Sequence, residues 1–229
     1  MPVNRILEIA CFNVESAILA QHAGADRIEF CENYKLGGIT PLQQNIAELR
    51  KKIHIPLFVM IRPRAGDYIY SAFEIEKIKQ SIFFCKEQHI DGLVFGALTA
   101  ENKIDIKLCE QVIQWAAPLP ITFHRAIDEC PNFDEAIAHL IKLGFKSVLS
   151  SGGSASARQG LKQLQHLQQK FGDHINIIAG GGIRSTNLNQ LFKSRCVNYH
   201  SAAITSNTEL PDTNEIKTMK DLLTNQSFF

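Results

Sequence analysis

A short apolar segment near the middle of the chain runs directly into polar side chains, at residues 120–128 (PITFHRAID). The alternation of a β-strand would place Thr122, His124 and Ala126 on one face and Arg125 on the other. An imidazole at a strand end can transfer protons near neutral pH, and a guanidinium can hold an anion. We therefore take His124 and Arg125 as candidate catalytic residues. A hydrogen-bonded core histidine beside a surface arginine is the structural alternative.

Carboxylates occur within two other apolar segments, Glu8 in residues 6–9 (ILEI) and Glu29 in residues 27–30 (RIEF). A buried carboxylate is costly unless it is paired, and Arg62, at the end of the apolar segment 57–62, is the natural partner. Two interpretations stay open. The group could be an ion network that only neutralises itself, or a catalytic site with an acid or base and a cation for a developing oxyanion.

The arrangement of the whole chain indicates how these residues could meet. Apolar segments with β character alternate with helical patterns from end to end, and eight strands in this length predict a single TIM (β/α)₈ barrel over residues 1–229 rather than a doubly wound sheet. The barrel core is expected at about 5–203 and a C-terminal helix at about 215–224. The expected strands are 6–11, 27–31, 57–62, 92–97, 121–126, 147–151, 176–179 and 198–202.

Helix starts and loop lengths add further expectations. Thr40 before Pro41 predicts a helix starting at Pro41, and Ser71 with Glu74 has capping-box spacing, as does Asn132 three residues before a glutamate. The chain is short for a barrel, so its loops should be short and the mouth open, without a lid. The polar strand ends should converge there.

Two glycine-rich turns predict an anion site. Gly152 and Gly153 follow the sixth expected strand, and residues 180–182 (Gly180, Gly181, Gly182) follow the seventh. Backbone amides at such turns can approach a phosphate or carboxylate, and Ser201 at the end of the last strand should lie beside them. The alternative is that these glycines only form tight turns.

Composition limits the classes of partner and location. The chain has 229 residues, with Lys+Arg 24 against Asp+Glu 23 and a net charge of +1, so a nucleic-acid partner is not expected. No apolar run reaches membrane-spanning length, no signal peptide is visible, and the six cysteines are scattered without a Cys-x-x-Cys pair. These features predict reduced thiols and a cytoplasmic location.

The cysteines could still bind a soft metal. Zinc motifs of the usual spacing are absent from the sequence, but Cu(I) accepts two thiolates, and Cys11 and Cys31 stand at the ends of the first two expected strands. Cys31 shares a face with Glu29, whereas Cys11 is out of phase with Glu8. The thiols can converge only if the first strand ends before Cys11. The alternative is two small buried hydrophobic side chains.

Eight segments, in order, closely resemble the CutC family of copper-homeostasis proteins, and the resemblance extends to about Ala203. The segments are 7–11 (LEIAC), 24–31 (GADRIEFC), 37–41 (GGITP), 59–67 (VMIRPRAGD), 93–99 (LVFGALT), 122–126 (TFHRA), 149–153 (LSSGG) and 180–183 (GGGI). The resemblance implies a cytoplasmic TIM barrel, usually homo-oligomeric, with a role in copper tolerance and Cu(I) held by cysteines matching Cys11 and Cys31. It implies no established reaction, and the matching mouth residues include Arg64.

The sequence therefore leaves two functions open. One is copper homeostasis with Cu(I) bound at the two thiols, and the other is an enzyme acting on a small anionic or phosphorylated metabolite, with His124 or a glutamate in proton transfer. The segment 71–85 carries more apolar residues than one helix face needs, so we also expect self-association, with a dimer favoured.

Overall fold

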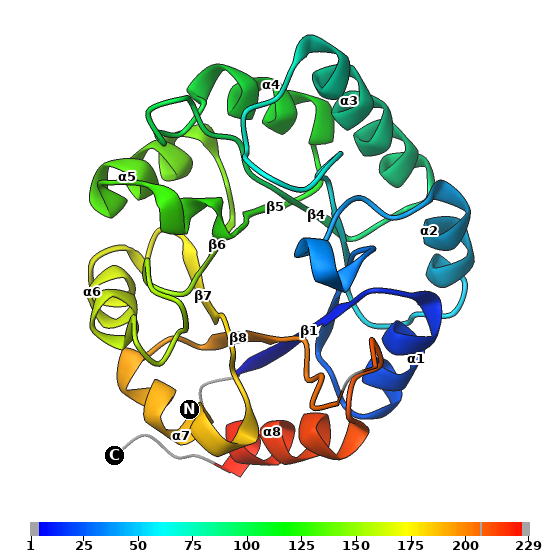
Figure 1. The fold of residues 1–229 in the computed structure, drawn as a ribbon, viewed down its shortest axis with the longest axis vertical. Coiled ribbons are helices and arrows are strands. Elements are labelled where there is room, and N and C mark those ends of the chain that lie inside the picture. The colour runs from blue at the N-terminus through cyan, green and yellow to red at the C-terminus, as the bar shows by residue number, and fades with distance from the viewer. Residues whose placement is uncertain (1–4, 207, 226–229) are drawn as a thin grey trace.

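The computed structural model describes residues 5–206 and 208–225, which form a closed barrel of eight parallel strands (Figure 1). The strand order follows the sequence, and β1 pairs with β8 to close the ring. The predicted TIM barrel is confirmed and all eight predicted strands are present, although those predicted at 57–62, 92–97 and 121–126 end two or three residues early. The strands are β1 Ile6–Cys11, β2 Arg27–Phe30, β3 Leu57–Met60, β4 Gly92–Phe95, β5 Ile121–Phe123, β6 Ser147–Ser150, β7 Asn176–Gly180 and β8 Asn198–Ser201.

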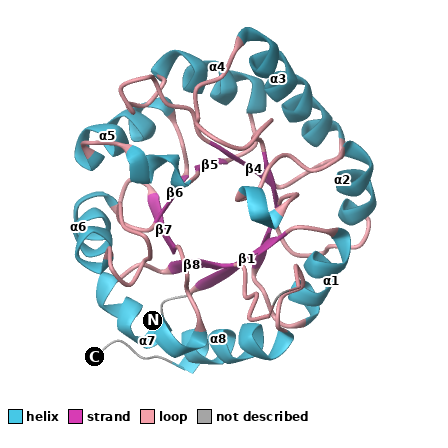
Figure 2. Cartoon of the chain, viewed as in Figure 1, coloured by secondary structure: helices cyan, strands magenta, loops and turns pink. Residues whose placement is uncertain are grey.

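The α-helices form an outer ring around the strands (Figure 2). Three short 3₁₀ helices lie in the connections: η1 Tyr34–Leu36, η2 Arg125–Glu129 and η3 Phe192–Ser194. The α-helices are α1 Val14–His22, α2 Gln43–Arg50, α3 Ala72–Glu87, α4 Ile106–Ala116, α5 Phe133–Leu143, α6 Leu161–Phe171, α7 Ser185–Leu191 and α8 Thr213–Asn225.

Two layers of apolar side chains explain why the strands are apolar on both faces. The larger layer packs the strands against the helices, and a smaller cluster that includes Phe58, Met60 and Val94 fills the barrel lumen. Gly92 makes room for one of these lumen side chains, because a Cβ there would lie 2.5 Å from the Phe58 ring. The polar site therefore rests on a packed apolar floor.

One predicted helix start is wrong and two are confirmed. Helix α2 begins at Gln43, two residues after Pro41, because the Thr40 hydroxyl instead accepts the backbone N–H of Arg62 at 2.7 Å. Ser71 and Glu74 form the predicted capping box of α3, and Asn132 caps α5. The Thr40 bond ties the loop after β2 to the end of β3.

One connection overhangs part of the mouth, which was expected to be open without a lid. The connection from β2 to α2 carries η1 over the ring of strands, where it is visible in blue near the centre (Figure 1). Tyr34 and Gly37 of this connection line the cavity at the mouth. Arg62 holds the connection in place by donating from Nη1 to the carbonyls of Leu36 and Gly38, both at 3.3 Å.

Most of the apolar surplus of α3 is absorbed within the chain. Ile78 and Ile82 are buried, while Phe73 is 69% and Phe83 42% exposed. Lys77 lies over the Phe73 ring, which shields part of it. Self-association through this helix stays a prediction. No helix in the described part of the chain is long and apolar enough to cross a membrane, and the cytoplasmic location stays a prediction as well.

The capping box of α3 is testable by a stability measurement. Ser71→Ala removes the hydroxyl that accepts the Glu74 N–H, and we expect the free energy of unfolding to fall by about 1 kcal/mol. Ser81→Ala, within the same helix, is the matched control and should change it little, because the Ser81 hydroxyl only bonds back to the Lys77 carbonyl. Urea denaturation of both variants checks this, and equal losses would contradict the assigned cap.

Candidate functional site

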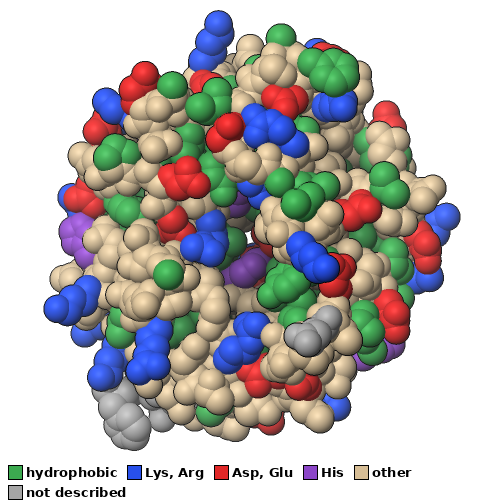
Figure 3. Space-filling model, viewed as in Figure 1, with side chains coloured by type: hydrophobic (Ala, Val, Ile, Leu, Met, Phe, Trp, Pro, Cys, Tyr) green, Lys and Arg blue, Asp and Glu red, His purple; other side chains and the backbone are tan. Residues whose placement is uncertain are grey.

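The carboxyl ends of the strands surround a cavity of about 290 Å³. Figure 3 shows the surface hollowed at this point, with a histidine side chain inside and Lys and Arg side chains around the rim. The cavity brings together five predicted site residues: Glu29, Cys31, Arg62, His124 and Arg125. Gly181, Gly182 and Ser201 line it too. The expected convergence of polar strand ends is thus present.

Glu8 lies at the closure of the barrel and is 2% exposed. Arg27 Nε, on β2, is 2.5 Å from one carboxylate oxygen, and His200 Nδ1, on β8, is 2.6 Å from the other. Burial alone would raise the pKa of Glu8, but the charges and hydrogen bonds of Arg27 and His200 outweigh it and lower the pKa to about 2. Glu8 is therefore an ionised structural anchor with both oxygens engaged.

Arg62 is not the partner of this carboxylate, contrary to our expectation. Strand β3 ends at Met60, and the Arg62 side chain extends over the Tyr68 ring, 4.9 Å from its centroid. Its Nη2 donates to the Gly66 carbonyl at 2.8 Å. His200 and Arg27 were not among the predicted site residues. Arg27 could have been found, because it begins the same strand as Glu29 and pairs in register with Glu8.

Glu29 is also buried, but it is less well satisfied than Glu8. His200 Nε2 is 3.7 Å from Glu29 Oε2, the Cys31 thiol donates to the same oxygen at 3.4 Å, and Oε1 has no hydrogen-bond partner within the described residues. Burial raises the pKa of Glu29, against the opposing pull of His200. Burial lowers the pKa of His200, but the two carboxylates outweigh it and raise that pKa overall. His200 thus lies between the two acids, hydrogen-bonded to Glu8 and 3.7 Å from Glu29.

Glu8, Glu29 and His200 could in principle surround a metal ion, because one ligand atom from each lies within 4.8 Å of the others. Both Glu8 oxygens and His200 Nδ1 are, however, already hydrogen-bonded to one another and to Arg27. A cation would have to displace the Arg27 guanidinium or break the bond between His200 Nδ1 and Glu8. The cluster neutralises itself within the chain, and we assign no metal to it.

His124 is not in a strand, so the predicted strand over 121–126 is wrong at its carboxyl end. Strand β5 ends at Phe123, and His124 caps η2 by accepting the Ala126 N–H at Nδ1, 3.2 Å away. The imidazole packs on Gly96, where a Cβ would collide with the ring. Burial, reinforced by the charge of Arg62, lowers the pKa of His124 to about 3, so the ring is neutral.

The glycine turn after β6 is occupied by an internal anion. The Asp128 carboxylate accepts the backbone N–H groups of Ser151 and Gly153 at 3.0–3.1 Å, and the Ser150 hydroxyl at 2.6 Å. The Gly152 N–H donates to Ser150 Oγ at 2.8 Å. Gly152 and Gly153 therefore hold a side chain of this protein and leave no amide for a ligand.

The glycine turn after β7 is available. Gly180 belongs to the strand, whereas the backbone amides of Gly181 and Gly182 make no hydrogen bond to the described residues. A Cβ on Gly181 would lie 3.6 Å from Arg125 Cζ, so the guanidinium lies against this turn. Ser201 donates to the Ile183 carbonyl at 2.7 Å and accepts two further bonds, so it supports the turn and has no free donor.

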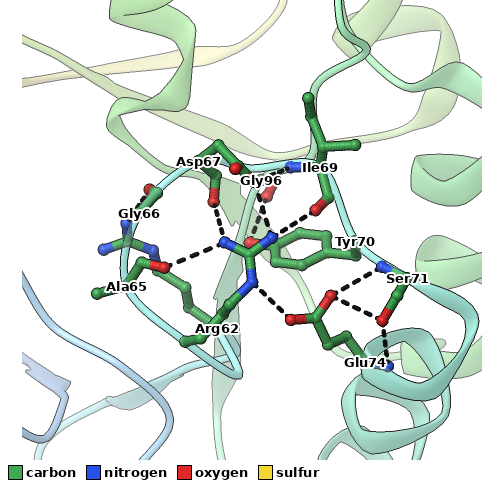
Figure 4. A network of polar contacts seen from close by, with 10 residues as sticks. Arg62, Ala65, Gly66, Asp67, Ile69, Tyr70, Ser71, Glu74 and Gly96 are labelled. Atoms are coloured by element: carbon green, nitrogen blue, oxygen red, sulfur yellow. Dashed lines mark hydrogen bonds and ion pairs between the residues drawn. The ribbon is translucent and has the colours of Figure 1, made fainter.

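Arg64 belongs to a structural network outside the cavity lining. Its guanidinium donates to Glu74 at 2.5 Å, to the Asp67 carboxylate at 2.8 Å and to the Ile69 carbonyl at 2.7 Å. Figure 4 shows these three partners, on the loop after β3 and in α3. These bonds fasten the loop after β3 to the start of α3. The family resemblance predicted Arg64 as a residue of the mouth. In the structure its N–H groups bond to the loop after β3 and hold that loop at the rim of the mouth.

The two candidate copper ligands lie on opposite sides of the barrel wall. Strand β1 continues through Cys11, whose thiol packs in the layer between strands and helices and donates to the Ile9 carbonyl at 3.6 Å. Cys31 faces the lumen and lines the cavity. Burial raises the pKa of both thiols, which disfavours the thiolate that binds metal. The pair does not fit a shared Cu(I) ion in this arrangement.

Comparison with known proteins decides the family. A profile of the CutC family matches residues 5–205. The chain belongs to the CutC family. A human protein named copper homeostasis protein cutC homolog is 41% identical over 199 residues, which is 86% of this chain and 73% of that protein. A CutC family protein of Histophilus somni is 41% identical over 187 residues, 82% of this chain and 77% of that protein.

Solved structures agree with this CutC assignment. A crystal structure described as a copper homeostasis protein CutC from Streptococcus agalactiae aligns with a TM-score of 0.82 at 30% identity, covering 86% of this chain and 98% of that one. A thiamine phosphate pyrophosphorylase from Pyrococcus furiosus aligns with a TM-score of 0.66 at 16% identity, covering 97% of this chain and 96% of that one. The second likeness shows the barrel fold alone.

The contrast between the two buried carboxylates predicts opposite effects on stability. Glu8, with its lowered pKa, stabilises the fold above pH 4.5 and loses that contribution as the pH falls toward 2. Glu8→Gln should therefore lower the free energy of unfolding at pH 7 by about 3 kcal/mol.

Glu29 has a raised pKa, so its ionised form opposes folding at neutral pH. Glu29→Gln is the matched comparison and should leave stability at pH 7 unchanged or increase it. Urea denaturation at pH 7 and pH 3 checks both variants. Equal losses for Glu8→Gln and Glu29→Gln at pH 7 would contradict the assigned difference.

Proposed function

We propose that the barrel mouth of this CutC-family protein binds and acts on a small anionic metabolite, so that the chain is an enzyme. One observation carries the proposal. Buried polar atoms are nearly always hydrogen-bonded within a protein, yet several on residues within or just after β2, β3 and β5 lack a partner among the described residues. They are Glu29 Oε1, Arg62 Nε, Thr122 Oγ1 and His124 Nε2.

The chemistry of these atoms suits a polar ligand. A carboxylate oxygen can accept a hydrogen bond, while the guanidinium and the imidazole can donate. The lumen position of Thr122 follows from its pairing with Val94, which belongs to the lumen cluster. Glu29, Arg62 and His124 line the cavity, so a ligand there would provide partners that the protein itself does not.

The cationic rim supports a negative charge on that ligand. Arg62, Arg125 and Arg184 line the cavity, and the amides of the turn after β7 are available beside Arg125. Arg184 donates to Ser201 and to the Ile204 carbonyl, which orients its guanidinium at the mouth. Backbone amides and a guanidinium together favour a phosphate or carboxylate group.

Phosphate titration tests the anion site. Arg125→Gln should weaken the binding of inorganic phosphate about tenfold, because it removes a charge-assisted hydrogen bond. Lys193→Gln, in η3 just before β8 at the opposite end of the barrel, makes the same charge change and should leave affinity unchanged. Isothermal titration calorimetry measures both. No phosphate binding by the unaltered protein, or equal weakening by both changes, would refute the anion site.

A role in copper homeostasis is the second candidate, favoured by the names of the human and Streptococcus agalactiae relatives. A site built on both thiols would bind one Cu(I) per chain and would lose it when either cysteine became serine. The opposite orientation of the two thiols predicts a different result for Cys11.

Cys11→Ser should leave any Cu(I) stoichiometry unchanged, because its thiol lies in the helix-facing layer. Cys31→Ser, its counterpart at the cavity, is the comparison. Titration with Cu(I) in the presence of a competing colorimetric chelator under reducing conditions gives the stoichiometry. Loss of one Cu(I) equivalent in Cys11→Ser would show that the two thiols converge when copper binds.

A further inference from the structure

The tautomer of His124 determines what this residue can do. The Ala126 N–H can only donate, so Nδ1, which accepts it at 3.2 Å, carries no proton. In a neutral imidazole the proton must then be on Nε2. His124 is 4% exposed and lies beside the Arg62 charge, which keeps the ring neutral. The Nε2–H is therefore a fixed hydrogen-bond donor.

This donor has no acceptor among the residues the structure describes, and its surroundings hold it in position. The ring lies 4.9 Å from that of Tyr68, between centroids, and Gly96 leaves the space in which it sits. A neutral imidazole whose free nitrogen is already protonated cannot take up a proton there. The role of His124 as a base, one of the options that the sequence left open, does not fit this geometry.

Glu29 provides the complementary group. Its Oε1 accepts no hydrogen bond within the described chain, and the residue lines the same cavity as His124. In the closed strand order, β2 and β5 are separated by β3 and β4 on one side and by four strands on the other. The acceptor and the donor thus approach the lumen from different sides, with the cavity between them.

We propose that the site acts on a small carbonyl compound carrying a phosphate or carboxylate group, and that it moves the proton on the carbon next to the carbonyl. This inference rests on the proposed function. His124 Nε2–H donates to the carbonyl oxygen, Glu29 Oε1 accepts the proton from carbon, and Arg125 with the turn after β7 holds the anionic group.

The electrons and protons balance without another reactant. The C–H pair becomes the new C=C bond, the carbonyl π pair moves onto oxygen, and Glu29 becomes a carboxylic acid. The His124 hydrogen bond and the nearby Arg62 charge stabilise the enolate oxygen. Return of the proton to the same carbon gives the starting compound or its epimer and regenerates the Glu29 carboxylate. Its transfer to the former carbonyl carbon gives an isomer when the neighbouring hydroxyl passes its proton to the former carbonyl oxygen.

Deuterium exchange tests the reaction without knowledge of the natural substrate. The probes are dihydroxyacetone phosphate, ribulose 5-phosphate and pyruvate in D₂O, followed by ¹H NMR for loss of the proton signal next to the carbonyl. We expect exchange above the uncatalysed rate for at least one probe. Exchange of the phosphates alone or of pyruvate alone identifies the anionic group. No exchange of any probe overturns the inference.

Variants assign the roles. Glu29→Gln should abolish exchange, and His124→Leu should slow it about 100-fold, whereas His124→Gln, which keeps an N–H donor, should recover part of the rate. A rate for His124→Leu equal to that of the unaltered protein overturns the assignment of the donor. Thermal unfolding checks that each variant is folded, and Lys193→Gln is the control expected to exchange normally.

A second probe separates this inference from the proposed function. Phosphoglycolohydroxamate carries the charge distribution of an enediolate, and glycerol 3-phosphate has the same phosphate with an alcohol in place of the carbonyl. The protein should bind the hydroxamate about 100-fold more tightly, and His124→Leu should remove most of that preference. Equal affinity for the two, with phosphate still bound, would refute the reaction while leaving the anion site intact. Failure to bind phosphate would refute both.

Discussion

Compensation of the buried Glu8 charge at the closure of the barrel is the constraint on which the polar lumen depends. Strand β1 lies between β2 and β8, and Glu8 receives Arg27 from one neighbour and His200 from the other. Pairing of both oxygens offsets the cost of burying this carboxylate. The first, second and last strands are therefore joined by one charge as well as by backbone hydrogen bonds.

The same compensation leaves Glu29 available. His200 is bound closely to Glu8 and only at 3.7 Å to Glu29, so the second carboxylate keeps an oxygen without a partner in the described chain. The two glycine turns at the rim differ in the same way. Asp128 accepts the backbone amides of the turn after β6, whereas the amides of Gly181 and Gly182 in the turn after β7 bond to no described residue. The groups that bond to one another, such as Glu8 with Arg27 and His200, are not free for a ligand. Those without a partner in the described chain, such as Glu29 Oε1, remain to contact one.

Membership in the CutC family and the placement of the thiols carry different information. Family membership rests on similarity along residues 5–205 and does not depend on which way any side chain points. A two-thiol copper site does depend on it, because strand β1 runs through Cys11 and turns that thiol toward the helices. If β1 ended one residue earlier, the Cys11 thiol could turn toward Cys31 and share a metal with it. Because β1 includes Cys11, the two thiols are buried apart.

The amino-acid sequence by itself determined the barrel. Eight apolar segments alternating with helical patterns have few other ways to bury their surfaces. The ends of the predicted strands also identified Glu29, Arg62, His124 and Arg125 as residues of the mouth, and all four line the cavity. Capping at Ser71 was equally local, since a hydroxyl and a carboxylate three residues apart suffice.

Only the tertiary structure decided which of these groups pair and which stay free. Glu8 binds His200, 192 positions away, and the Gly153 amide binds Asp128, 25 positions away, because β-strand closure and loop folding bring them together. The tautomer of His124 depends on where β5 stops, which the sequence of residues 121–126 does not reveal. Which side chains form ion pairs, which face of a strand each one occupies and which nitrogen carries a proton all depend on distances in the folded chain. Sequence spacing constrains such distances only within one helix or strand.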